Sequence, residues 1–247
     1  AKYLWSPIKK SFKPIQRRMD IFYAGTNLVD NHSSKWVVNM GHLLGSFNNS
    51  FFGIEPTKKT VMLWYCEFYR VENNKITEGA FFLDILKFMQ HLKLSVVPDS
   101  TGMIGFNPGP KTHDGLYFEK QSDEEGDKTL DLMMRMANRL IGEGMRTTIS
   151  DLEKDWHKDM IWWGPDGIGA SYTYDGYLRG HTGPFEENLE FVEFSGHVLE
   201  NSEGNFGGWF GWPNLKMKPK GSYMGFKQDT DLVGEMRVVD LYRRDGD

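Results

Sequence analysis

The feature that most constrains the fold is a pattern typical of a long strand, followed directly by the pattern of a second strand that runs back beside the first. Residues 61–71, VMLWYCEFYRV, are rich in aromatic and β-branched side chains, which is typical of a long buried strand. The polar residues 72–75 predict a turn, and residues 76–83 predict the returning strand. Residues 84–94 then carry apolar side chains at helical spacing, namely Ile85, Leu86, Phe88, Met89 and Leu92. The pattern predicts an antiparallel hairpin that leads into a short helix.

A break and a second set of elements follow. Residues 98–127 contain Pro108-Gly109-Pro110 and the acidic run Asp123–Glu125, which favour a linker. A helix is expected next, ending near Gly142 and Gly144, because one apolar stripe contains Leu130, Met133, Met134, Ala137, Leu140 and Ile141. A second short helix is predicted over 150–159, with Ser150 as N-cap and Glu153 at the reciprocal position. Residues 161–163 then enter a turn at 164–167.

Composition narrows the class of protein. With 39% hydrophobic and 26% charged residues, the chain is typical of a soluble globular protein, and 14% aromatic residues indicate ring-lined cores or pockets. The net charge of -5 argues against a nucleic-acid partner. No apolar run is long enough to span a membrane, and the first residues lack the core of a signal peptide. Cys66 is the only cysteine, which favours a reducing, cytoplasmic location.

The two halves of the chain share an order of features. Each has a Gly-His pair, then a Gly-rich aromatic stretch, then Pro with Lys, then a strand that closes in Tyr-Arg and a polar turn. The pairs are Gly41-His42 and Gly196-His197, so the repeat distance is about 155 residues, which is the size of a domain.

Several motifs resemble the SnoaL-like polyketide cyclase family of the NTF2-like superfamily. The family has a Gly-His element, Gly-Ile-x-Pro-Thr with a Lys, a strand ending in Arg-Val, a Lys-Ile-x-Glu turn and an Asp before a Leu-rich helix. The matching residues here are Gly41-His42, Gly53-Ile54-Glu55-Pro56-Thr57, Lys58, Arg70-Val71, Asn74-Lys75-Ile76-Thr77-Glu78 and Asp84. The second half matches more loosely, through Trp162-Trp163-Gly164-Pro165 and Gly167-Ile168-Gly169.

The resemblance implies an α+β fold of two NTF2-like (SnoaL-like) cone modules, each a curved, mostly antiparallel sheet packed on helices. The expected boundaries are 1–105 for a first module without its N-terminal helices, 106–127 for the linker, and 128–247 for a second module without its last strand. Both ends of the chain are therefore expected to be cut. The family's habit of pairing sheets implies that the modules pack as a pseudo-dimer, and a homo-oligomer is possible.

The resemblance also implies an intramolecular aldol cyclisation, or a related isomerisation or dehydration, of a small hydrophobic carbonyl or polyketide-like substrate without a cofactor. Such chemistry needs a base for a proton next to a carbonyl and a donor for the enolate. The predicted catalytic residues are Asp84, whose pKa burial would raise, and His42 as donor or proton shuttle. Asp84 could equally be the N-cap of the following helix, and His42 a core histidine.

Other side chains are candidates for binding the substrate. They are Trp36, Trp64, His157, Trp163, Tyr172, His181, His197 and Trp209. The tryptophans could stack on a flat substrate or simply fill a core, and each histidine could be structural. No Cys/His cluster has zinc-ligand spacing and no nucleotide loop is complete, so no metal or cofactor is expected.

A second interpretation is a non-catalytic NTF2-like module for small-molecule binding or assembly. The two interpretations differ at Asp84. An enclosed pocket around Asp84, within reach of His42, favours the enzyme, whereas a solvent-facing cap favours the binding module.

Overall fold

The computed structural model describes residues 3–103, 114–227 and 231–246. The predicted linker at 106–127 therefore lies partly outside the described residues. The elements before it are α1 (Trp5–Ser11), β1 (Phe12–Thr26), β2 (Lys35–Phe47), β3 (Thr60–Glu72), β4 (Lys75–Leu83) and α2 (Ile85–His91).

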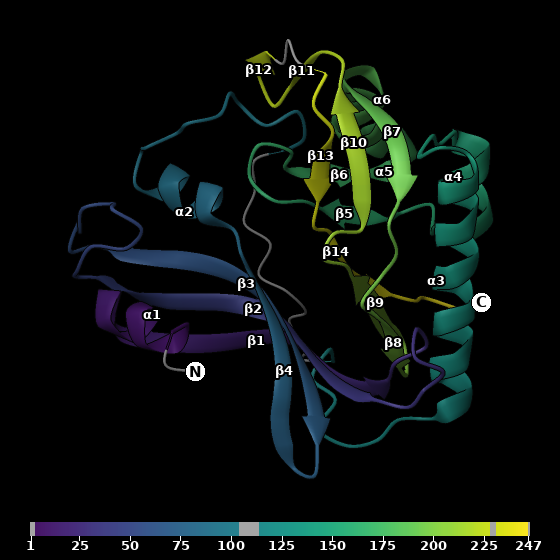
Figure 1. Ribbon diagram of the computed structural model, residues 1–247, viewed down its shortest axis with the longest axis horizontal. Helices are drawn as coiled ribbons and strands as arrows, with labels where there is room; N and C mark the ends of the chain where they lie inside the picture. The colour runs from purple at the N-terminus through teal and green to yellow at the C-terminus, as the bar shows by residue number, and fades with distance from the viewer. Residues whose placement is uncertain (1–2, 104–113, 228–230, 247) are drawn as a thin grey trace.

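The first part of the chain is a four-stranded antiparallel sheet in the order β1-β2-β3-β4 (Figure 1). The predicted hairpin and helix are confirmed, because β3, β4 and α2 occupy the expected ranges. Asn73 and Asn74 both have positive φ (50° and 58°), a conformation that asparagine tolerates in a tight turn between strands.

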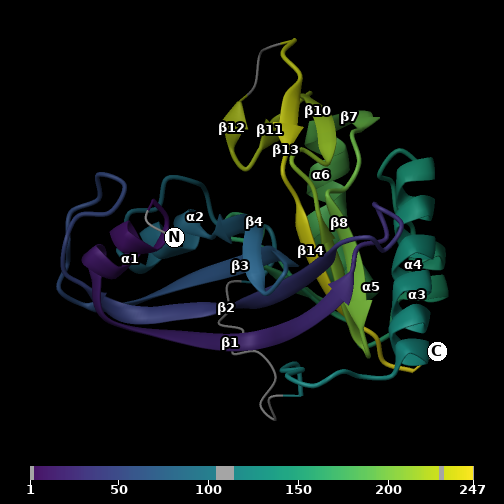
Figure 2. The ribbon, with the colours of Figure 1, turned by 60° about the horizontal axis from the view of Figure 1, so that its bottom comes forward.

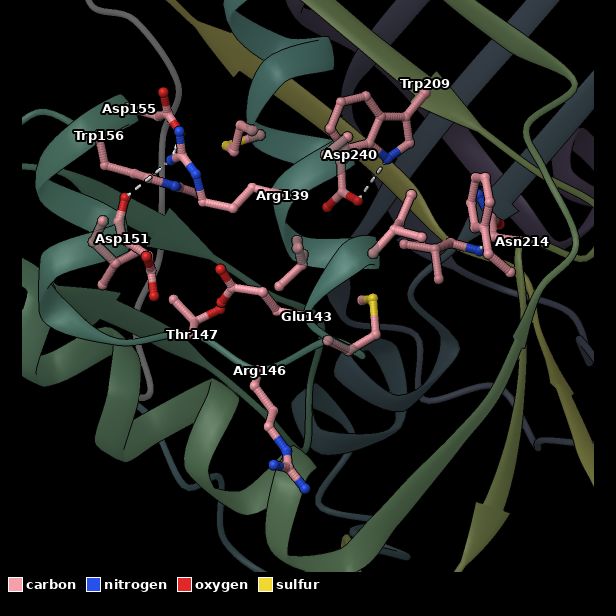
Figure 3. A pocket seen from close by; sticks show the side chains of 18 of the residues that line it. Arg139, Glu143, Arg146, Thr147, Asp151, Asp155, Trp156, Trp209, Asn214 and Asp240 are labelled. Carbon is pink, nitrogen blue, oxygen red and sulfur yellow. Dashed lines mark hydrogen bonds and ion pairs between the residues drawn. The ribbon is translucent and has the colours of Figure 1, made fainter.

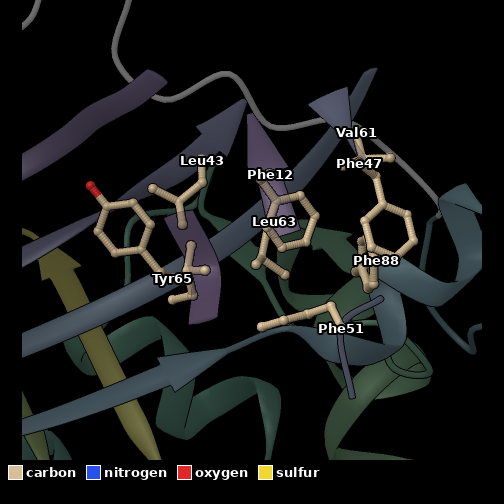
Figure 4. Close-up of a cluster of buried hydrophobic side chains, with 9 residues drawn as sticks. Phe12, Leu43, Phe47, Phe51, Val61, Leu63, Tyr65 and Phe88 are labelled. Atoms are coloured by element: carbon tan, nitrogen blue, oxygen red, sulfur yellow. The ribbon is translucent and has the colours of Figure 1, made fainter. Parts of the chain in front are cut away.

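One face of this sheet packs against α1 and α2, which lie on the same side of it (Figure 2). The core there is a cluster of phenyl rings and aliphatic chains, drawn in Figure 4. Phe88 of α2 is fully buried, and its ring meets those of Phe12 and Phe47 edge to face at 5.5 and 5.1 Å. Burial of these rings therefore holds α2, and with it the end of β4, against the sheet.

The second part of the chain combines helices with small sheets. Its elements are α3 (Asp123–Gly142), α4 (Ile149–Asp155), β5 (Ile161–Trp163), β6 (Ala170–Tyr172), α5 (Thr173–Tyr177), the π-helix η1 (Leu178–Thr182), α6 (Gly183–Asn188), β7 (Leu189–Phe194), β8 (Leu199–Glu203), β9 (Phe206–Phe210), β10 (Leu215–Pro219), β11 (Ser222–Tyr223), β12 (Phe226–Lys227), β13 (Gly234–Met236) and β14 (Val239–Arg243).

Two three-stranded antiparallel sheets form the frame of this part, in the orders β13-β10-β7 and β14-β9-β8. The long helix α3 runs beside them, and α4 lies next to it (Figures 1 and 2). The apolar stripe expected on α3 is confirmed, because Leu130, Met133 and Ala137 are buried. The helix ends at Gly142, as expected, and Gly144 follows at φ 65°.

Two helix starts differ from the prediction. Helix α3 begins at Asp123, so the acidic run forms its first turn rather than a linker, since carboxylates are favourable at a helix N-terminus. Ser122 caps this turn by accepting the Glu125 N–H. Helix α4 begins at Ile149, with Thr148 as N-cap instead of Ser150, and it ends at Asp155. The carboxylate of Asp151 accepts the Thr148 N–H at 3.1 Å, which completes the cap.

The two parts of the chain meet sheet against sheet through a ring-rich core. Ile21, Tyr23, Trp36, Val38 and Phe68 of the first sheet bury against Leu199, Phe206 and Phe210 of β8 and β9. The Phe210 ring lies 4.5 Å from that of Phe68. Because side chains alternate along a strand, Trp209 and Asp240 point to the opposite face. This packing therefore commits one face of β9 and β14 to the core and turns the other toward α3.

The Gly-His pairs do not occupy equivalent places, and that part of the sequence comparison is wrong. Gly41-His42 lies within β2, which pairs with both β1 and β3. Gly196-His197 lies in the connection between β7 and β8. Both Tyr-Arg pairs lie in strands, but Tyr69-Arg70 comes two residues before the end of β3 at Glu72, whereas Tyr242-Arg243 ends β14. Glycine and histidine each serve several structural roles, so a shared Gly-His pair does not imply an equivalent position in the fold.

The molecule is thus a mixed α+β protein built on antiparallel sheets. In the ranges that the structure describes, no helix is both long and apolar enough to cross a membrane.

Replacing Phe210 should destabilise the protein strongly, because its ring lies at the centre of the core between the two parts. We expect Phe210→Ala to lower the free energy of unfolding by about 3–5 kcal/mol, measured by urea denaturation. Phe118→Ala is the control, since that ring is 67% exposed, and it should have little effect. Equal losses in the two variants would contradict this account of the core.

Candidate functional site

The main pocket lies in the second part of the chain, between α3, α4 and the inner face of β9 and β14. The cavity has a volume of about 110 Å³, counted as the space that the centres of water molecules can occupy. This volume is enough for several waters or a small organic molecule. Its walls carry many rings, namely Trp156, Trp162, Tyr177, Phe194, His197, Trp209 and Tyr242. Polar groups at the wall include Arg139, Glu143, Asp151, Asp155, Asn214 and Asp240.

Trp209 links the acidic and basic groups of this pocket. Its indole Nε1–H donates to Asp240 Oδ2 at 2.9 Å, the bond drawn in Figure 3. Its ring stacks on the His197 ring at 5.1 Å with only 12° between the planes. The Tyr242 ring lies 4.9 Å from it. One fully packed indole therefore fixes both a carboxylate and an imidazole at the pocket wall.

His197 has a carboxylate partner of its own. Its Nδ1 lies 2.7 Å from Glu200 Oε1, and both side chains are nearly buried. A carboxylate at this distance accepts the Nδ1 proton, which leaves Nε2 to exchange a proton with a ligand. The pair forms because His197 precedes β8 and Glu200 lies in it, opposite Trp209 in the register of β8 and β9.

Asp240 is a carboxyl group in a largely apolar setting. Burial raises its pKa, and the Trp209 hydrogen bond and nearby His197 oppose that rise. Burial also raises the pKa of the Tyr177 and Tyr242 phenols. At neutral pH these tyrosines keep their protons and can donate hydrogen bonds, while Asp240 is a better base than an exposed aspartate.

The opposite wall is charged and tied together by ion pairs. Asp155, at the end of α4, pairs with Arg135 at 3.0 Å and with Arg139, both from α3. The Thr148 and Lys154 side chains bond Asp151 and lower its pKa to about 2. Figure 3 shows Asp151, Asp155 and Trp156 across the pocket from Asp240 and Trp209. The Asp155 pairs join α4 to α3, whereas the side-chain bonds of Asp151 lie within α4 and its N-cap.

Of the side chains predicted to bind substrate, His197 and Trp209 line the main pocket. Trp64 and Trp163 instead line a second cavity of about 10 Å³, room for one water, together with Asp84. Their rings lie 6.1 Å apart at the junction of the two parts.

The other predicted binding residues lie elsewhere. Trp36 is buried between the two sheets and donates from Nε1 to Ser34 Oγ at 2.9 Å. His157 and Tyr172 are exposed. His181, in η1, stacks on Trp162 at 4.0 Å, and burial lowers its pKa to about 4, so it is neutral at pH 7.

Asp84 caps α2 and also holds the second part of the chain. Its Oδ1 accepts the Lys87 N–H at 2.9 Å, and its Oδ2 accepts the Asp166 N–H at 3.0 Å. Burial raises the pKa of Asp84, and these two hydrogen bonds oppose the rise. His42 lies on β2, with Nδ1 3.5 Å from Asp20 Oδ2. A catalytic role for Asp84 and His42 stays a prediction.

Sequence reasoning missed Asp240, although a signal was present. Asp240-Leu241-Tyr242-Arg243 repeats the acid-apolar-Tyr-Arg pattern of Glu67-Phe68-Tyr69-Arg70. An acid between apolar neighbours in a strand points to the face opposite theirs, so it meets solvent, a pocket or a buried partner, as Glu67 meets Arg17.

Across 3–103, 114–227 and 231–246, no group of three or more His, Cys, Asp or Glu side chains is arranged to hold a metal ion. Comparison of the chain with family models, with curated proteins and with solved structures finds no match. The resemblance to SnoaL-like cyclases therefore rests on the motifs alone.

Removing the Asp84 carboxylate should weaken the junction of the two parts. Asp84→Ala loses the cap of α2 and the bond to Asp166, so the free energy of unfolding should fall by about 2 kcal/mol in urea denaturation. Asp99→Ala, which removes an exposed carboxylate nearby, is the matched control. An Asp84→Ala protein as stable as its control would show that the two bonds contribute nothing.

The partly buried Asp240 should make stability depend on pH. Its folded pKa lies above the ordinary 3.8, so the native state binds its proton more tightly and loses stability as pH rises from 3.8 through the folded pKa. Asp240→Asn removes that loss and retains an acceptor for Trp209. The variant should therefore be more stable than the wild type at pH 7, with the difference shrinking toward pH 3, in urea denaturation at each pH. A difference independent of pH would refute the burial of charge at Asp240.

Proposed function

We propose that this chain is a SnoaL-like cyclase-type enzyme that performs general acid/base chemistry on a small hydrophobic carbonyl or polyketide-like compound. The reaction is an intramolecular aldol cyclisation or a related isomerisation or dehydration. Its site is the pocket of the second part, with Asp240 as base. The reaction needs only a base and hydrogen-bond donors, which the side chains of this pocket can supply without a cofactor.

The observation that carries the proposal is the arrangement around Trp209. An indole that bonds Asp240 and stacks on His197 holds two proton-transfer groups at one wall of a ring-lined cavity. Groups for proton transfer work best when their orientation is fixed before the ligand binds. The aromatic walls suit a flat, apolar ligand.

The proposed steps conserve every proton. The Asp240 carboxylate takes a proton from the carbon next to a carbonyl, and the electron pair moves to the carbonyl oxygen as an enolate. Tyr177 or Tyr242 donates a hydrogen bond to that oxygen. The enolate carbon then attacks a second carbonyl of the same molecule, forming the ring bond, and the new alkoxide takes the proton back from Asp240. His197 Nε2 can relay this last proton.

We further propose that the two parts are copies of one NTF2-like module, packed through their sheets as a pseudo-dimer. Strand register supports this. In the first part Glu67 of β3 lies opposite Asn39 of β2, and in the second part Asp240 of β14 lies opposite Trp209 of β9. In both parts a tyrosine follows the acid by two residues.

The register also favours the second part as the active one. Glu67, the counterpart of Asp240, is fully buried and paired with Arg17, whose Nε also donates to Tyr65 at 3.2 Å. Burial raises the pKa of Glu67 to about 7, against the effect of Arg17. Glu67 is engaged by Arg17 and lines neither of the two cavities described above, whereas Asp240 borders the main pocket.

Asp240→Asn tests the proposal with a panel of polyketide-like esters and small β-dicarbonyl compounds. Turnover should fall by about 10²-fold or more, because the amide cannot accept the proton. Glu190→Gln, which neutralises an exposed acid on β7, should retain wild-type turnover.

The same panel separates the alternatives. Loss of turnover in Asp84→Asn, with Asp240→Asn active, would move the chemistry to the first part. Saturable ligand binding by the wild type without turnover of any compound would make the pocket that of a binding module instead.

A further inference from the structure

The turn between β1 and β2 reaches across to the strand that bears Glu200. Asn27, the first residue of this turn, is 3% exposed. Its Nδ2 donates to Val198 O at 3.0 Å, and its Oδ1 accepts the Glu200 N–H at 3.1 Å. The next residue, Leu28, donates its N–H to Glu200 O at 2.8 Å. The first part of the chain thus bonds three backbone groups of residues 198 and 200.

The turn itself is rigid. Asn27 N–H donates to Ser34 O at 3.0 Å, and Asn27 O accepts the His32 N–H at 2.7 Å. Asn27 Oδ1 also accepts the Val29 N–H at 3.1 Å. An amide side chain held on its own backbone in this way is a fixed point rather than a mobile surface group.

Asn27 holds the short backbone segment that joins His197 to Glu200. β8 is short and pairs with β9 along one edge, while Asn27 and Leu28 hold its beginning from the other side. His197 directly precedes Val198, and the Glu200 side chain shares a face with Trp209. Val198 O lies between the two residues and the N–H and C=O of Glu200 are also held, so these bonds fix the backbone path that sets the Glu200 side chain relative to His197.

We propose that Asn27, from the first part of the chain, is a positioning residue that holds the His197–Glu200 pair in the pocket of the second part. This inference rests on the proposed function for its catalytic meaning, and the geometry of the pair can be tested without turnover. Through Asn27, the first part of the chain contributes to the site of the second part, although its own acid, Glu67, is paired with Arg17.

The experiment follows the His197 Nδ1–H proton by NMR of 15N-labelled full-length protein. A proton shared with a carboxylate resonates far downfield and exchanges slowly with water, and its signal is assigned by its disappearance in His197→Gln. The variants are Asn27→Ala and, as matched control, His32→Ala, an exposed side chain in the same turn. Turnover is measured on the same samples.

Asn27→Ala should lose or broaden the Nδ1–H signal, while His32→Ala retains it. With a turned-over substrate, kcat should fall by about tenfold or more with KM little changed, because the pair is displaced rather than the ligand walls. A folded Asn27→Ala protein with the wild-type signal and kcat overturns the inference.

Asn27→Asp decides the question if Asn27→Ala does not fold. It retains the acceptor for Glu200 N–H and lacks the donor to Val198 O, so the signal should shift or broaden, and an unchanged signal again overturns the inference. Failure of the proposed function appears differently: the signal would depend on Asn27 while Asp240→Asn left turnover intact.

Discussion

The packing of the first sheet against β8 and β9 is the constraint on which the rest depends. It buries Leu199, Phe206 and Phe210 against the rings of the first sheet. A strand has two faces, so this burial assigns the alternate side chains, Trp209 and Asp240, to the other side. The pocket is therefore a consequence of the core behind it. A slip of one residue in β14 would turn Asp240 into the apolar core, and the same slip in β9 would do so to Trp209.

The pocket contains carboxylates whose burial is compensated in different ways. Asp155 is almost fully buried, yet two arginines match its charge. Asp240 has an indole N–H as its bonding partner and keeps a raised pKa. In the first sheet, Glu67 shares features of both: Arg17 pairs with it, and burial raises its pKa to about 7. Position separates the two acids, because Asp240 borders the main pocket and Glu67 lines neither cavity, which is why Asp240 is the proposed base.

Local patterns predicted the local structure well. The run at 61–71 and its return gave β3 and β4, and the stripe from Leu130 onward gave the buried face of α3. The prediction of a linker at 123–125 is wrong, because these acidic residues form the first turn of α3, where carboxylates are also favourable. Asp84 was expected both as an acid and as a cap, and the structure shows the cap bond together with a bond to Asp166, 82 residues away. Asp240 and Asn27 owe their place to strand register and to contacts across 31 and 173 residues, which no local pattern contains.

The position of Trp209 bears on the fluorescence of the protein. Its indole N–H donates to a carboxylate and its ring face is covered by an imidazole, in the wall of the main pocket. Indole emission responds to the charge of a bonded acid and to a stacked histidine. Trp156 and Trp162 also line the pocket, and the chain has eight tryptophans, so the part of the emission that reports this wall is the part that a Trp209→Phe variant loses.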